Sequence, residues 1–119
     1  MYPEATVQAE KKGSELVGWE YEPLFPYVKD ALPPTEKEKL GNAFKIYAAD
    51  FVGATDGTGV VHIAPMYGAD DFTLGTEKQL PKFHTVNEEG KFIDAVKPFA
   101  GMFVKKADKE IVKIGRAHV

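Results

Sequence analysis

The sequence contains no cysteine, a single serine (Ser14) and no apolar run close to the roughly 20 residues that span a bilayer. Without cysteine the chain has no disulfide, no thiol nucleophile and no cysteine-bound zinc, which is compatible with a reducing compartment. The N-terminus also lacks the apolar core of a signal peptide. These absences predict a soluble, cytoplasmic protein without a membrane partner.

The chain also lacks an excess of positive charge. Its net charge of -3 argues against a broadly basic nucleic-acid surface, although a local lysine patch could still meet a phosphate backbone. Its 119 residues, 44% of them hydrophobic and 28% charged, are typical of one globular domain. We assign residues 1–114 to that domain. The last residues, "GRAHV" (115–119), interrupt the apolar periodicity before them and are predicted to be a tail added to the natural sequence, so His118 carries little weight.

Alternating and apolar segments predict several strands. Residues 15–21 alternate in the manner of a strand, and residues 43–52 form a second one. The turn "ATDGTG" then leads into "VVHIAP", so we expect residues 43–52 and 60–65 to pair as a hairpin, with Gly57 and Gly59 serving the turn.

Helices are predicted to be short. Residues 33–41 fit one helix with a capping box formed by Thr35 and Glu38, and residues 69–80 fit another that starts with acidic residues. A second hairpin is expected around residues 87–90, and a strand from residue 101 precedes a helix that starts near Asp108. The pattern as a whole predicts a mainly β fold with short helices.

Several classes of catalytic site find no support in the sequence. Ser14 lies in a polar approach to a strand, so a Ser-His-Asp triad has no well-placed nucleophile. The three histidines, His62, His84 and His118, show no metal-binding spacing, and we expect no metal site. The "GTG" of residues 57–59 is too short for a phosphate-binding loop and is better explained by a turn.

Two residues of "GTGVVHIAPMYGADDF" (57–72) suggest a binding site. His62 is either a core histidine bonded to a backbone carbonyl or part of a pocket, and spacing does not decide between them. Asp71 either stabilises the start of a helix or holds an ammonium group by a charge-assisted hydrogen bond. With two adjacent aspartates, Asp70 is the better cap and Asp71 the better ligand. The residues alone predict a strand-turn-helix pocket suited to a small cationic ligand.

Three separated stretches resemble one known family in its own order. They are "SELVGWEYEPLFPYV", "DFVGATDGTGVVHIAPMYGADDF" and "VNEEGKFIDAVKPFAGMFVKKADKEIV", which together cover most of the chain. The sequence is similar to the editing insertion of isoleucyl-tRNA synthetases, called connective polypeptide 1. Valyl enzymes usually carry lysine, and leucyl enzymes methionine, at the position of His62, so the resemblance favours the isoleucyl branch.

The resemblance implies a β-barrel-like domain that hydrolyses valine wrongly attached to the isoleucine tRNA. Such editing is needed because one methylene in an apolar pocket discriminates by only roughly 1–3 kcal/mol, a limit for which the isoleucyl enzymes are the standard example. It also implies catalytic roles for His62, which would line the pocket, and for Asp71, which would fix the substrate's α-amino group. Substrate binding is assigned by the resemblance to Gly57, Thr58, Gly59, Tyr67, Asp70 and Asp71.

The implied partners are the aminoacylated 3′ end of tRNA(Ile) and the rest of the synthetase. The domain itself would need no cofactor, whereas the whole enzyme uses ATP and Mg. Water positioned by the domain and by the terminal adenosine would attack the ester, which agrees with the missing triad.

Two departures from the family pattern concern the site. The family's threonine-rich peptide is expected upstream and does not precede "YPEATVQAEKKGSEL", and Tyr67 stands where the family has a second pocket histidine. The chain is therefore predicted to be a partial editing domain whose activity in isolation is in doubt. A non-catalytic module, in which His62 and Asp71 stabilise the turn and Lys105 and Lys106 contact RNA, is the alternative. A valyl-type domain acting on threonine is a third, against which His62 argues.

Overall fold

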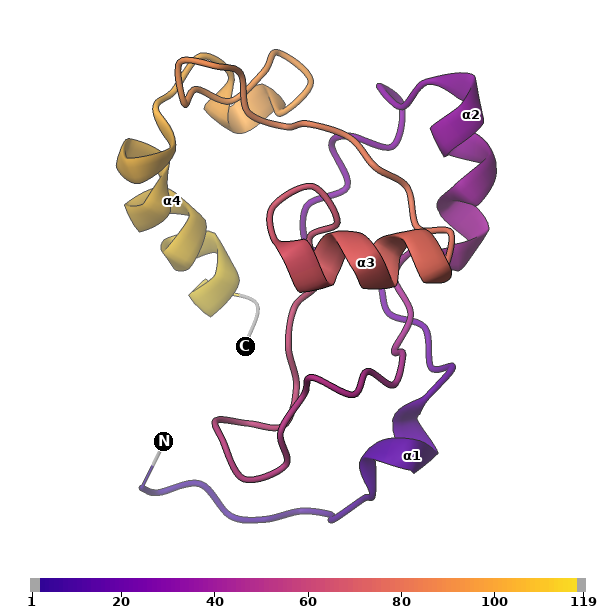
Figure 1. Ribbon diagram of the computed structural model, residues 1–119. Coiled ribbons are helices and arrows are strands. Elements are labelled where there is room, and N and C mark those ends of the chain that lie inside the picture. The colour runs from indigo at the N-terminus through magenta and orange to yellow at the C-terminus, as the bar shows by residue number, and fades with distance from the viewer. Residues whose placement is uncertain (1–2, 118–119) are drawn as a thin grey trace. The chain divides into compact units, whose positions relative to one another are not determined.

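A computed structural model describes residues 3–117, which form two compact units (Figure 1). Unit 1 combines residues 3–21 with Phe44–His62, and unit 2 combines Glu22–Ala43 with residues 63–117. The chain therefore leaves unit 1 after Tyr21, returns to it at Phe44 and leaves it again after His62. No helix in the described part of the chain has the length and apolar character needed to cross a membrane.

The prediction of a mainly β, barrel-like fold was wrong. Helices hold 34% of the described residues and strands only 5%, with no sheet or barrel among them. The β structure of residues 3–117 consists of three isolated antiparallel bridges, Glu20 with Lys45, Val86 with Phe92, and Lys91 with Phe103.

The strands predicted in unit 1 end after a single bridge. Backbone bonds join Gly18 to Ile46 (2.8 Å), Ile46 to Trp19 (2.9 Å) and Tyr21 to Phe44 (2.9 Å). Gly18 has a φ of 88° and Phe44 a φ of 58°, and such left-handed residues turn each segment out of the extended path. Helix α1 (Gly13–Leu16) takes up the start of the segment that we predicted as a strand.

The hairpin expected between residues 43–52 and 60–65 is also absent. Residues 44–46 pair with 18–21 instead, and residues 60–64 make no β-bridge with the described residues. Val60 and Val61 are 70% and 51% exposed. The turn itself forms as expected, because Gly57 and Gly59 have positive φ values of 64° and 72°.

Unit 2 confirms the two short helices read from local signals. Helix α2 (Pro34–Lys37) runs into the 3-10 helix η1 (Glu38–Asn42), and α3 (Ala69–Glu77) covers most of the second predicted helix. The capping box was wrong, because the N-cap is Pro33, two residues before Thr35, and it makes no side-chain capping bond. Proline is well suited to the first helical position, where its missing N–H costs no helical bond.

The C-terminal half of unit 2 contains the 3-10 helix η2 (Lys97–Phe99) and α4 (Val104–Ala117). The turn predicted around residues 87–90 forms, with the Asn87 Oδ1 atom accepting hydrogen bonds from the Glu89 and Lys91 amides (both 3.0 Å). Helix α4 begins four residues before Asp108, so the strand predicted ahead of it is reduced to the bridging residue Phe103. The helix continues through Gly115–Ala117, and His118 lies outside the described residues.

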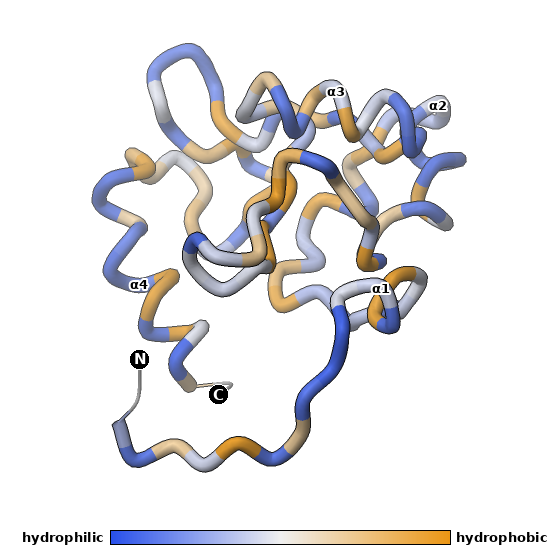
Figure 2. The backbone as a smooth tube through the Cα atoms, turned by 60° about the horizontal axis from the view of Figure 1, so that its bottom comes forward, coloured by the Kyte–Doolittle hydropathy of each residue, from blue (hydrophilic) through white to orange (hydrophobic). Residues whose placement is uncertain are grey.

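The core of unit 2 lies where α4 meets η2. Val96, Phe99 and Ala107 are buried, Ala107 completely, and Ile111 and Ile114 pack against them from the same face of α4. Figure 2 shows the corresponding alternation of hydrophobic and hydrophilic backbone segments along α4. Burial of this apolar stripe explains why a helix forms here despite the many charged residues of its sequence.

A half-buried carboxylate links α2 to the chain after α3. The two oxygens of Glu36 accept hydrogen bonds from the Lys39 Nζ atom and from the Lys82 amide, both at 2.7 Å. The side-chain bond from Lys39, and then the backbone bond from Lys82, hold the pKa of Glu36 below its ordinary value of 4.5.

This lowered pKa predicts a pH-dependent contribution to stability. Because the folded pKa lies below the unfolded one, the contribution is fully present above about pH 4.5 and is lost as the pH falls through the folded pKa. The free energy of unfolding of Glu36→Gln should therefore approach that of the wild type as the pH falls below this value. Denaturant unfolding across the acidic range measures it. Lys39→Gln should weaken the pH dependence only in part, since the hydrogen bond from the Lys82 amide to Glu36 remains. Parallel pH profiles of the wild type and Glu36→Gln would contradict the assignment of this pH dependence to Glu36.

Candidate functional site

The predicted site residues are divided between the two units. Gly57, Thr58, Gly59 and His62 belong to unit 1, whereas Tyr67, Asp70 and Asp71 belong to unit 2. The second group lies where an extended segment turns at residues 65–66 and enters α3. The turn and the helix of the connection predicted around Asp71 form, whereas the segment before them is extended but makes no β-bridge with the described residues.

Asp71 holds the turn together through the backbone of Ala64. Its Oδ2 atom accepts a hydrogen bond from the Ala64 amide at 2.9 Å, and the Ala64 carbonyl accepts one from the Tyr67 amide at 2.8 Å. Gly68 is the N-cap of α3 and has no side chain that could accept a hydrogen bond from the first amides of the helix. The Asp71 carboxylate lies over Gly68, so that a Cβ atom at Gly68 would be 3.1 Å from the Asp71 Cγ atom.

The second oxygen of Asp71 has a different environment. Asp71 is half-buried, and its Oδ1 atom accepts no hydrogen bond from the described residues. One oxygen is therefore fixed by the backbone while the other keeps its capacity to accept a donor. A carboxylate oriented in this way is suited to a charge-assisted hydrogen bond with an ammonium group.

The prediction that Asp70 caps the helix was wrong, whereas the ligand role of Asp71 stays a prediction. Asp70, predicted to cap the helix, is exposed and has no hydrogen-bond or ion-pair partner among residues 3–117. Asp71 makes the structural bond and also keeps a vacant acceptor position. Both carboxylates still lie in the first turn of α3, where the helix dipole favours negative charge.

The hydroxyl of Tyr67 ties the turn to a distant segment. The Oη atom accepts hydrogen bonds from the amides of Thr85 (2.8 Å) and Val86 (3.2 Å), and it lies 3.3 Å from the Thr85 Oγ1 atom. The Tyr67 ring meets the ring of His84 edge-on, with centroids 5.9 Å apart. Tyr67 thus positions the turn, a role that the sequence did not reveal because its partners lie 18 and 19 residues away.

Residues of unit 1 form a locally bonded, exposed turn. The Thr58 Oγ1 atom donates to the Val60 carbonyl (3.1 Å) and accepts from the Val60 amide (3.3 Å). His62 is exposed in this chain and makes no hydrogen bond with the described residues, so the alternative of a core histidine was wrong. Residues 3–117 contain no group of three or more His, Cys, Asp or Glu side chains arranged to hold a metal ion.

The chain is similar to curated proteins named isoleucine–tRNA ligase. The isoleucine–tRNA ligase of Clostridium acetobutylicum is 48% identical over 110 residues, which are 92% of this chain and 10% of the relative. That of Clostridium novyi is 49% identical with the same coverage, and that of Picrophilus torridus is 43% identical over 85% of this chain and 9% of the relative. No family model matches the chain.

These alignments confirm the resemblance drawn from the sequence. The chain is homologous to a segment of isoleucine–tRNA ligases, and it spans about a tenth of the length of the curated relatives it matches.

Proposed function

We propose that this chain is the editing part of an isoleucine–tRNA ligase, which hydrolyses valine wrongly esterified to tRNA(Ile). The observation that carries the proposal is the Asp71 carboxylate, with one oxygen bonded to the Ala64 amide and the other vacant. The identity of 43–49% with isoleucine–tRNA ligases supports it. The proposed partners are the aminoacylated 3′ end of the tRNA and the rest of the ligase, in the cytoplasm.

Asp71 is proposed to bind the α-ammonium group of the esterified amino acid. Its Oδ1 atom would accept from the ligand, while Oδ2 accepts from the Ala64 amide. The fixed oxygen limits rotation of the carboxylate, so little side-chain entropy is lost on binding. Fixing the ammonium group also fixes the neighbouring ester carbonyl, and such positioning is a large part of the rate gain available to a site without a nucleophile.

The reaction itself is the addition of water to the ester carbonyl carbon. The bond to the ribose oxygen breaks, that oxygen takes up a proton, and valine leaves as its carboxylate with release of a proton. On the family resemblance alone, we propose that His62 and the Gly57-Thr58-Gly59 turn contact the substrate. Within unit 2, we propose that Tyr67 also contacts the substrate and that Asp70 adds negative charge near the ammonium group. Hydrolysis of this kind requires no cofactor, whereas ATP and Mg serve the synthetic reaction of the whole ligase.

A non-catalytic module that binds the tRNA end is the second candidate. It is favoured by one specific observation, that Asp71 and Tyr67 both make backbone hydrogen bonds that stabilise the turn. In this case their side chains are needed for the fold and not for chemistry.

Deacylation of charged tRNA separates the two candidates. The chain is incubated with valyl-tRNA(Ile) and, separately, with isoleucyl-tRNA(Ile), and loss of the ester is followed against the spontaneous rate. Editing predicts hydrolysis of the valyl ester at least about tenfold faster than that of the isoleucyl ester, in keeping with the roughly 1–3 kcal/mol that a methylene provides. Binding of both tRNAs by a folded chain without faster hydrolysis would contradict editing and support the non-catalytic module.

A further inference from the structure

Helix α4 gathers a third of the chain's cationic side chains onto one face. Five of the 15 lysine and arginine residues lie in its 14 residues, together with only two acidic residues, so the helix carries a net charge of +3 in a chain of net charge -3. At 100° per residue, these five cations fall within roughly 100° of arc. We call this set the basic arc; it consists of Lys105, Lys106, Lys109, Lys113 and Arg116.

The basic arc is exposed and largely unpaired. All five side chains are exposed, and the only ion pair that α4 makes within residues 3–117 joins Lys113 to Glu110 at 3.3 Å on the surface. Asp108 and Glu110 lie at the two borders of the arc and not within it. A helix whose charges serve only solubility usually intersperses both signs at i,i+4 spacing, whereas Lys106 alone among these five cations has an acidic residue, Glu110, at that spacing.

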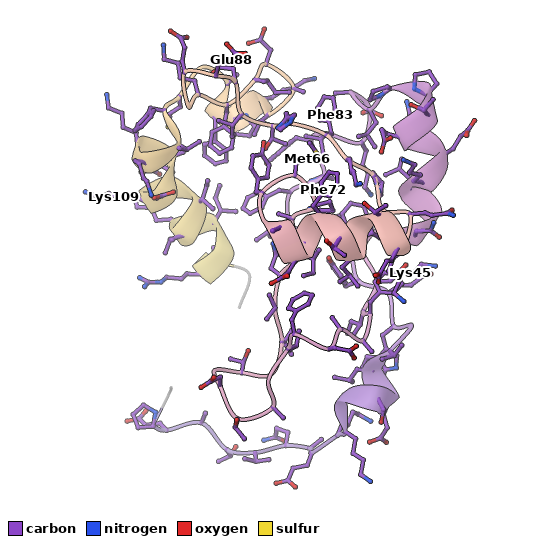
Figure 3. The ribbon with its side chains drawn as sticks, viewed as in Figure 1. Lys45, Met66, Phe72, Phe83, Glu88 and Lys109 are labelled. Atoms are coloured by element: carbon purple, nitrogen blue, oxygen red, sulfur yellow. The ribbon has the colours of Figure 1, made fainter. Side chains whose placement is uncertain are left out.

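The apolar face of α4, opposite the basic arc, is not available for binding to a membrane. Basic amphipathic helices commonly lie on membranes with their apolar face in the lipid. Here that face is occupied, since Ala107 is fully buried and Ile111 and Ile114 pack against the core. Insertion into lipid would require this core to open, so α4 has only its cationic side to offer; Lys109 is seen on this helix in Figure 3.

We propose that the basic arc docks α4 on the phosphate backbone of double-stranded RNA, as in the acceptor stem of a tRNA. Lys105 and Arg116 are 11 residues apart, so the arc extends for about 16 Å along the helix axis. Duplex RNA is recognised mostly through its shape, phosphates and 2′-hydroxyls, for which a row of lysines suffices. Single-stranded RNA is instead bound by stacking on aromatic side chains, and the sequence of α4 contains none. The choice of tRNA as the RNA rests on the function proposed above.

Binding of uncharged RNA tests this inference independently of editing. Dissociation constants are measured at several salt concentrations for uncharged tRNA(Ile), for an RNA duplex and for a single strand of the same length. Lys105→Gln/Lys109→Gln should weaken binding to the tRNA and the duplex by roughly tenfold or more at 0.1 M salt. It should also lower the slope of log K against log salt by about two, because each lost phosphate contact removes nearly one unit.

A matched variant controls for the loss of charge. Lys37→Gln/Lys97→Gln also removes two exposed lysines of unit 2, outside α4, and should leave both the affinity and the slope close to wild type. Equal effects of the two variants, no effect of the α4 variant, or tighter binding to the single strand or to anionic phosphatidylserine vesicles would overturn the inference. RNA binding that depends on Lys105 and Lys109 in a chain without deacylase activity would support it while the proposed function fails.

Discussion

Asp71→Asn is expected to keep the fold and to lose most of the proposed deacylase activity. Asparagine has nearly the same shape as aspartate, and its carbonyl oxygen can still accept the Ala64 amide that Asp71 holds at 2.9 Å. It carries no charge for the ammonium group, and hydrogen bonds to charged groups are worth about 1.5–3 kcal/mol. Hydrolysis of valyl-tRNA(Ile) should therefore fall by at least about tenfold in kcat/KM, whereas the midpoint of thermal unfolding should change little.

Two neighbouring substitutions make this result specific. Asp71→Ala removes both the charge and the acceptor, so the Ala64 amide loses its partner and unfolding should become easier by about 1–3 kcal/mol in addition to the loss of activity. Asp70→Asn removes the same charge from an exposed side chain without a partner among the described residues, and it should have the smaller effect on both measurements. If Asp71→Asn hydrolyses valyl-tRNA(Ile) as fast as Asp70→Asn does, Asp71 does not bind the ammonium group.

The sequence predicted those parts of the fold that depend on neighbouring residues. Helix α3 follows from the acidic residues in its first turn. Helix α2 with η1 was predicted from a capping box that does not form, and its start is instead marked by a proline at the first helical position. The turn around Asn87 is likewise local, because its own side chain bonds the amides that follow it.

The prediction of a barrel-like fold failed because strand pairing depends on partners that are distant in the sequence. The mostly apolar run of residues 60–65 after a turn indicates a strand but does not say which segment supplies its hydrogen bonds, and within residues 3–117 no segment does so. The left-handed conformation of Phe44 could not be foreseen, because such a residue is rare at this φ.

The candidate site shows the same limit. The charge and position of Asp71 marked it as a candidate ligand-binding residue. Its hydrogen bond to the Ala64 amide has no signal in the sequence, since any residue except proline has an amide to donate. The role of Tyr67 was missed for the same reason, as its hydroxyl meets two backbone amides of a remote segment. His62 and Tyr67 were linked to one site by resemblance, and the structure places them in different units.

Gly75 shows how a residue that is unfavourable for a helix can be required by packing. It is a buried residue within α3, where glycine costs about 1 kcal/mol relative to alanine. A Cβ atom at Gly75 would come within 2.8 Å of the Pro65 Cβ atom and 3.0 Å of its Cγ atom. Pro65 follows Ala64, whose amide binds Asp71, so this close contact supports the turn that carries the proposed site. In contrast to the buried Gly75, Phe72 of the same helix is 47% exposed; it is labelled in Figure 3.

Gly75→Ala is therefore expected to destabilise the protein although it improves helix propensity. The gain of up to about 1 kcal/mol is outweighed by an overpacking cost of about 1–3 kcal/mol, because the Pro65 ring cannot rotate away. The matched control is Gly115→Ala in α4, where a Cβ atom would meet nothing within 4 Å, and it should stabilise by up to about 0.5 kcal/mol. Thermal unfolding of the two variants should show shifts of opposite sign, and an equal or higher midpoint for Gly75→Ala would mean that Pro65 does not hold α3 at this distance.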